Sequence, residues 1–84
     1  MNLQVLARNV RRLRTAKRCS QIGLANAAGL SLPALKNIEL AKTEPRVRTV
    51  QAIAKALEVR LQDLFVSVRQ LQTVRFRSSR RMQN

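Results

Sequence analysis

The stretch SQIGLANAAGLSLPALKNIE, residues 20–39, contains two short apolar runs separated by one glycine. Ser20 and Ser31 each stand directly before a run, where a hydroxyl accepts hydrogen bonds from the first free amides of a helix. Gly29 ends the first run, because glycine adopts positive φ without steric cost. Pro33 suits the first turn of the second run, where an amide has no helical partner. The stretch therefore predicts two short helices that meet at a tight turn.

Apolar residues also recur at intervals of three or four before and after this stretch, as the buried face of a helix requires. They predict a helix that begins at Leu3, a fourth helix over 47–57 after a connector at 42–45, and a last turn over 61–65. The apolar positions are Leu3, Leu6, Val10 and Leu13 before the stretch, and Val47, Val50, Ile53, Ala54 and Leu57 after it. The predicted fold class is all-α, a compact five-helix bundle formed by residues 1–65.

The pattern changes in residues 66–84, a basic extension with five arginines and no acid. Val66, Val68, Val74 and Phe76 all have even numbers, and this period of two predicts a β-strand. A strand of this kind would pair with a second copy of the chain across a two-fold axis. A solvated tail or a linker remains the alternative.

Charge and residue types restrict the function. Seventeen Lys and Arg against four acids give a net charge of +13, which attracts polyanions, nucleic acid first among them. One cysteine, Cys19, and no histidine exclude an internal disulfide and a Cys/His metal site, so no metal or cofactor is expected. The usual acid-base arrangements cannot be assembled either, and we expect no enzyme.

Neither membrane insertion nor export is expected. No apolar run approaches the length of a membrane span, and the amino end lacks the pattern of a signal peptide. A long uninterrupted basic amphipath, which would bind anionic lipid, is missing too. The expected location is the cytoplasm.

Beyond these patterns, the chain resembles the phage-repressor type of helix-turn-helix, the XRE family of bacterial and phage transcription regulators, over about residues 3–65. The resemblance implies a five-helix DNA-binding domain, usually dimeric, that represses or activates transcription at a partly symmetric operator. The residues that carry it are Leu13-Arg14, Ser20-Gln21, Leu24-Ala25, Ala28-Gly29-Leu30-Ser31, Leu35, Ile38-Glu39, Lys42, Pro45 and AIAKALEVRLQDLF at residues 52–65.

In such repressors the second helix of the motif, here 31–40, enters the major groove, and the resemblance places Leu32, Lys36 and Asn37 on its base-contacting face. The side-chain chemistry agrees. Lys36 can donate to guanine O6 or N7, Asn37 can pair bidentately with adenine, and Leu32 can cover a thymine methyl. The expected function is that of a sequence-specific regulator of transcription, a repressor, which binds double-stranded DNA as a homodimer.

The resemblance also implies a set of DNA phosphate contacts. Gln21 lies where the family's glutamine opens the second helix and contacts a phosphate or braces the recognition helix. Arg46 stands where many relatives have a serine cap, exchanging a cap of about 1 kcal/mol for a charge aimed at phosphate. The expected phosphate contacts are Gln21, Lys42, Arg46 and Arg48.

Other positions concern the fold. The resemblance pairs Arg14 of the first helix with Glu39 at the end of the third, a structural role. Three positions where relatives often have a helix-stopping glycine are occupied by Arg18, Ala41 and Glu58. Left-handed conformations there would each cost about 1 kcal/mol relative to glycine, and the alternative is that the loops are rearranged.

Two alternatives remain at this point. The extension resembles the connector of longer family members that carry a metallopeptidase-like domain, and one alternative is that the chain is the DNA-binding part of such a regulator. A helical module that binds RNA or protein is the other alternative. Stacking on single-stranded RNA relies on aromatic side chains, and this chain has two Phe and no Trp or Tyr.

Overall fold

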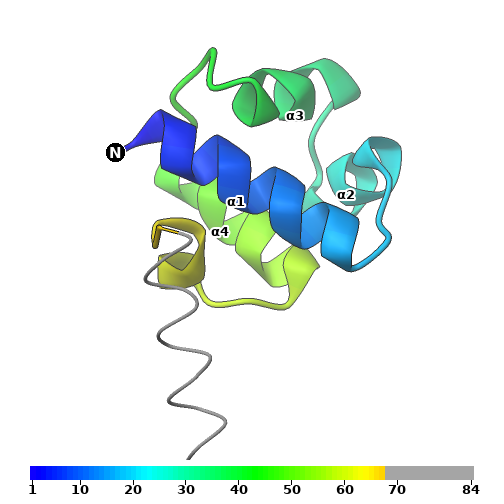
Figure 1. Ribbon diagram of the computed structural model, residues 1–84. Helices are drawn as coiled ribbons and strands as arrows, with labels where there is room; N and C mark the ends of the chain where they lie inside the picture. Colours follow the sequence, from blue (N-terminus) through cyan, green and yellow to red (C-terminus); the bar gives the residue numbers. More distant parts are fainter. Residues whose placement is uncertain (68–84) are drawn as a thin grey trace, which may run out of the picture.

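The computed structural model describes residues 1–67, which form a bundle of helices (Figure 1). The elements are α1 (Leu3–Ala16), α2 (Gln21–Ala28), α3 (Leu32–Glu39), α4 (Val47–Leu57) and the 3-10 helix η1 (Leu61–Leu64). The all-α fold is confirmed, but the fifth element is a 3-10 turn and not an α-helix. Its amides bond three residues back, from Asp63 to the Arg60 carbonyl and from Phe65 to that of Gln62.

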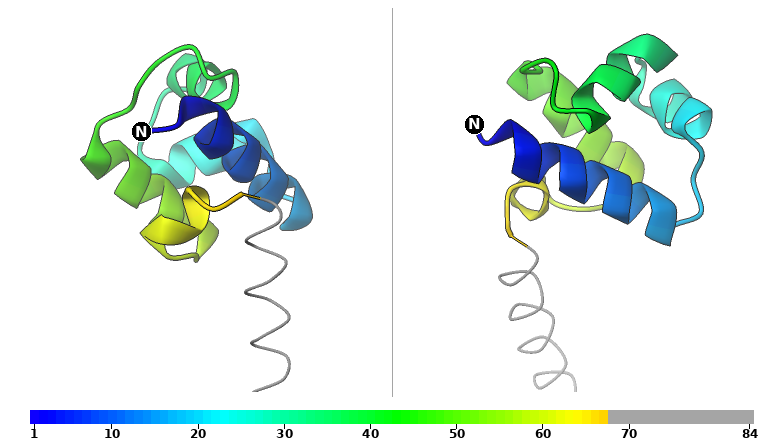
Figure 2. Two further views of the ribbon diagram at one scale, coloured as in Figure 1. Left: turned by 60° about the vertical axis from the view of Figure 1, so that its left-hand side comes forward. Right: turned by 45° about the horizontal axis from the view of Figure 1, so that its top comes forward.

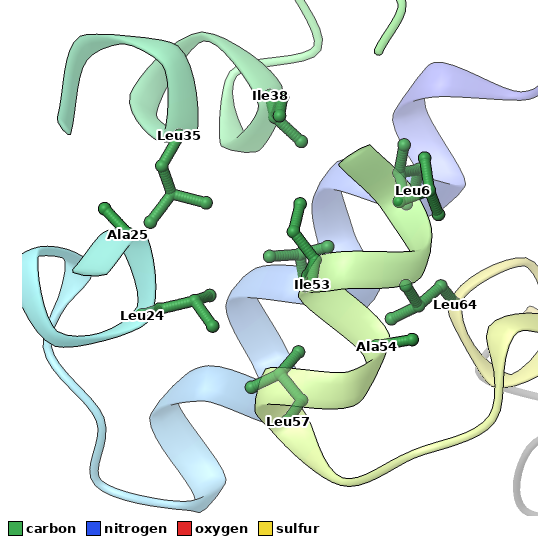
Figure 3. Close-up of a cluster of buried hydrophobic side chains, with 11 residues drawn as sticks. Leu6, Leu24, Ala25, Leu35, Ile38, Ile53, Ala54, Leu57 and Leu64 are labelled. Atoms are coloured by element: carbon green, nitrogen blue, oxygen red, sulfur yellow. The ribbon is translucent and has the colours of Figure 1, made fainter. Parts of the chain in front are cut away.

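The helices pack around one apolar core. α3 lies across α1, and α2 contacts both α3 and α4, so the two helices of residues 20–39 share one end of the bundle (Figures 1 and 2). Side chains from every element point into the space between them (Figure 3). The buried cluster is Leu6, Val10, Leu24, Ala25, Leu35, Ile38, Val50, Ile53, Ala54, Leu57 and Leu64. One expectation was wrong, because Val47 opens α4 beyond the core and is 58% exposed.

Side chains cap the first three helices. Asn2 accepts from the amides of Gln4 and Val5 at the start of α1. The expected serine caps are present, since Ser20 Oγ accepts from the Gly23 amide at 2.9 Å and Ser31 Oγ accepts from the Ala34 amide at 3.2 Å. The start of α4 differs, because its N-cap residue Arg46 makes no side-chain capping hydrogen bond.

The four α-helices end in the same way, although only one of them ends on glycine. In each, an amide bonds a carbonyl five residues back, around a residue with positive φ, as in the Schellman motif. The bonds run from Cys19 to Arg14, Leu30 to Ala25, Lys42 to Asn37 and Val59 to Ala54. The left-handed residues are Arg18 (φ 56°), Gly29 (φ 71°), Ala41 (φ 57°) and Glu58 (φ 59°). The loops are therefore not rearranged around the missing glycines.

The C-terminal end of the described chain is held to α1 by a buried amide. Asn9 is 1% exposed, and its Nδ2 donates to the carbonyls of Leu64 at 2.9 Å and Val66 at 2.7 Å. Residues 66 and 67 are not in a strand, and the rest of the strand expected over 66–84 lies outside the described residues.

The left-handed positions generate a stability prediction. Glu58→Gly should stabilise the fold by about 1 kcal/mol, because glycine relieves the Cβ strain at an exposed position. Gly29→Ala should destabilise it by about the same amount through the backbone alone, since a Cβ there would meet no atom within 4 Å. Urea unfolding followed by circular dichroism measures both changes. A loss of stability in Glu58→Gly would contradict the prediction.

Candidate nucleic-acid interface

One buried carboxylate joins the three helices at the end of the bundle. Glu39, at the last residue of α3, is 3% exposed. Arg14 from α1 donates to both of its oxygens, Nε to Oε2 at 2.7 Å and Nη2 to Oε1 at 3.1 Å. Gln21, the first residue of α2, donates Nε2 to Oε1 at 3.0 Å. This arrangement contains the pair that the family resemblance implies, and Gln21 makes the bracing contact.

Arg14 has a second function in the same place. Its Nη1 donates to the Cys19 carbonyl at 2.9 Å and so also holds the loop between α1 and α2. The hydrogen bond to Glu39 raises the pKa of Arg14, while burial opposes that rise. Because the guanidinium stays charged, the carboxylate keeps its counter-ion, and the angle of α3 against α1 and α2 is set by directed bonds.

Loss of this charge should destabilise the domain. Glu39→Gln keeps the side-chain shape but leaves Arg14 without its counter-ion, and we expect a loss of about 3 to 5 kcal/mol. Glu44→Gln is the matched control, since Glu44 is exposed and outside the network. Thermal melts of both variants test this, and equal melting temperatures would contradict the assignment of Glu39 to structure.

The outward face of α3 carries the expected base contacts. Lys36 is exposed, together with Pro33 and Leu40, which lie on the same stripe at helical spacing. Leu32 and Asn37 border this stripe and are half-buried. Leu40, 56% exposed at the C-cap, was missed by the sequence reasoning, which counted it in the helix and not on its surface.

Asn37 also lies at a groove that connects α3 with the next two segments. The groove encloses about 270 Å³ and is lined by Asn37 and Ala34 of α3, Thr43 and Pro45 of the connector, and Thr49 of α4. The face of α3 therefore continues across the connector onto the first turn of α4. Of the predicted base and phosphate contacts, Asn37 lines this groove.

The predicted phosphate-binding cations are exposed at the end of α3 and the start of α4. Lys42 follows the C-terminus of α3, Arg46 is the N-cap of α4, and Arg48 is in the first turn of α4. No acid lies in that first turn, and its amides have no side-chain cap. The positive end of the helix dipole thus adds to the two arginine charges.

Other kinds of site find no support among the described residues. Residues 1–67 contain no group of three His, Cys, Asp or Glu side chains placed to hold a metal ion. None of the helices formed by those residues has the length and apolarity that crossing a membrane requires.

Comparison with known proteins identifies the fold family. The family model HTH_3, described as helix-turn-helix, matches residues 10–64. The chain belongs to the HTH_3 helix-turn-helix family. Its motif consists of α2, the Gly29 turn and α3, the two helices that residues 20–39 predict. A search of curated proteins found no match.

Solved structures resemble the HTH_3 chain over most of its length. The restriction-modification controller protein C.AhdI from Aeromonas hydrophila is 28% identical with a TM-score of 0.73, over 75% of this chain and 96% of that one. A hypothetical transcription factor, NHTF from Neisseria, is 26% identical with a TM-score of 0.82, over 86% and 83% of the two chains.

A longer protein is similar as well. An HTH_3 family transcriptional regulator from Vibrio cholerae is 28% identical with a TM-score of 0.74, over 82% of this chain. The present chain spans only 39% of that regulator's length. The family and these neighbours together support a DNA-binding transcription regulator.

Proposed function

We propose that this HTH_3 chain is a sequence-specific regulator of transcription that inserts α3 into the major groove of double-stranded DNA. The observation that carries the proposal is that Lys36 is exposed on α3, with the half-buried Asn37 beside it and exposed cations after the helix. Lys36 donates to guanine, Asn37 pairs with adenine and Leu32 covers a thymine methyl, chemistry that the major groove distinguishes.

Phosphate contacts hold α3 in register. Lys42, Arg46 and Arg48 bind the backbone on the connector side of α3, and the uncapped amides at the start of α4 donate to the same phosphates. Gln21 lies on the other side, at the start of α2. Its Nε2 is engaged by Glu39, so the phosphate role of Gln21 uses its remaining amide hydrogen.

Loss of a base contact and loss of a phosphate contact should have different effects on DNA binding. Lys36→Ala and Asn37→Ala should each reduce discrimination between the operator and random duplex by about 1 to 3 kcal/mol, because a base contact is lost. Lys42→Ala should weaken both duplexes equally and lower the slope of log K against log salt by about 1, because a phosphate contact carries no sequence information. Operators are first selected from a random duplex pool.

An equal loss on operator and random duplex for Asn37→Ala would contradict its assignment to the bases. Lys55→Ala serves as a charge-matched control for Lys42→Ala, because Lys55 is exposed on α4 beyond the first turn. Lys55→Ala should leave the salt slope unchanged.

Substitution of Arg46 should change folding stability and DNA affinity in opposite directions. Arg46→Ser supplies the missing N-cap of α4 and should raise the free energy of unfolding by about 1 kcal/mol. The same change removes a phosphate contact and should weaken DNA binding at low salt. Urea unfolding and salt-dependent binding of one variant measure both effects, and unchanged DNA affinity would contradict the role given to Arg46.

The regulator is proposed to be a repressor that binds DNA as a homodimer. Repression by occupying an operator needs no catalytic or metal site. A dimer would read two half-sites about 34 Å apart, one helical turn of DNA. Symmetry in the selected duplexes would support the dimer, and a single half-site would contradict it. Sedimentation of a chain that ends at Val66 tests whether residues 67–84 contribute to dimerisation.

A further inference from the structure

A second basic surface lies on α1, formed by Arg8, Arg11 and Arg12 and continuing to Thr15. Arg8 and Arg11 are exposed, whereas Arg12 is half-buried. Two surface hollows meet there, one of about 290 Å³ between α1 and the end of α3 and one of about 540 Å³ along α1 itself. Arg8 and Arg11 line both hollows, so they form one continuous surface, called here the α1 arginine face.

Only part of this face is turned away from the proposed DNA surface. Arg14 marks the direction from α1 to α3, because it contacts Glu39 there. At 100° per residue, Arg12 is rotated from that direction by about 160° and lies on the opposite side of α1. Arg8 and Arg11 border the end of α3, because they line the first hollow together with Leu40 and Ala41. The proposed DNA contacts leave this charge unused.

Within the described residues 1–67, the α1 arginine face has no acidic partner, and the one hydrogen bond of its arginine side chains runs from Arg12 Nη2 to Asn9 Oδ1 at 3.5 Å. The ion pairs within residues 1–67 join Arg14 with Glu39 and Arg60 with Asp63, and neither pair involves Arg8 or Arg11. The buried Nε of Arg12 has no hydrogen-bond acceptor in the same part of the chain. The nearest acid, Glu39, lines one hollow but is already bonded to Arg14 and Gln21.

We infer that the α1 arginine face binds an acidic segment of a partner protein. The face presents forked guanidinium donors at helical spacing along one side of α1, which suits carboxylates in bidentate contacts. Residues 8 to 15 cover about 11 Å at 1.5 Å per residue, enough for a few consecutive acidic side chains. None of its arginines is among the proposed DNA contacts, so in this inference, which rests on the proposed function, the regulator holds such a segment while it is bound to DNA.

A labelled oligoglutamate of about 12 residues, longer than the face itself, is the probe for fluorescence anisotropy with the full chain. Arg8→Gln/Arg11→Gln should raise its Kd about tenfold or more, because two charge-assisted contacts are lost. Lys17→Gln/Lys55→Gln removes the same net charge from exposed positions elsewhere and should change Kd less than about twofold. Glutamine keeps α1 helical, and circular dichroism checks this.

Equal losses of oligoglutamate binding in the two double variants would overturn the inference, because net charge alone would then explain the binding. A loss of duplex affinity in Arg8→Gln/Arg11→Gln as large as its loss of oligoglutamate affinity would also overturn it and assign the face to nucleic acid. Lys36→Ala should leave oligoglutamate binding unchanged. The measurement needs no operator, so it stands apart from the proposed DNA function.

Discussion

The Glu39 carboxylate is the interaction on which the rest of the structure depends. It accepts hydrogen bonds from Arg14 of α1 and Gln21 of α2 while it terminates α3, so three helices meet at two oxygens. Apolar packing is non-directional and would hold these helices together at a range of angles. Directed, charge-assisted bonds select one of them. The outward direction of Lys36, three residues before Glu39, follows from that choice.

Short connections make the same geometry possible. Each α-helix within residues 1–67 is followed by a left-handed residue, and the amide after that residue bonds a carbonyl five residues back, so the helix stops and the chain changes direction there. In three of the four cases the residue after the turn, Cys19, Leu30 or Val59, packs against the core. The fourth is Lys42, which is exposed. The turn after α3 therefore presents a cation where its equivalents present an apolar side chain, and this change supplies the proposed DNA surface.

The proposed DNA contacts use only part of the positive charge of the domain. Lys36, Lys42, Arg46 and Arg48 lie on α3 and near the start of α4, whereas the α1 arginine face lies along α1. A net charge of +13 is therefore only partly explained by the proposed DNA contacts. These cations also repel each other, which makes the buried ion pair of Arg14 and Glu39 more important for the compact state.

Local signals in the sequence determined the helices, the serine caps and the turn at Gly29, because each depends on residues within one or two turns of the chain. The family resemblance supplied the Arg14 and Glu39 pair and pointed to Arg18, Ala41 and Glu58, whose left-handed conformations the structure decided. Only the tertiary structure decided what depends on distant segments: that Asn9 holds the carbonyls of Leu64 and Val66, that Gln21 reaches Glu39, and that Leu40 is exposed. The sequence did contain one sign of the Asn9 contact, because Asn9 is a polar residue among the apolar residues of α1. A buried polar side chain needs a hydrogen-bond partner, but only the position of residues 64–66 shows which partner it has.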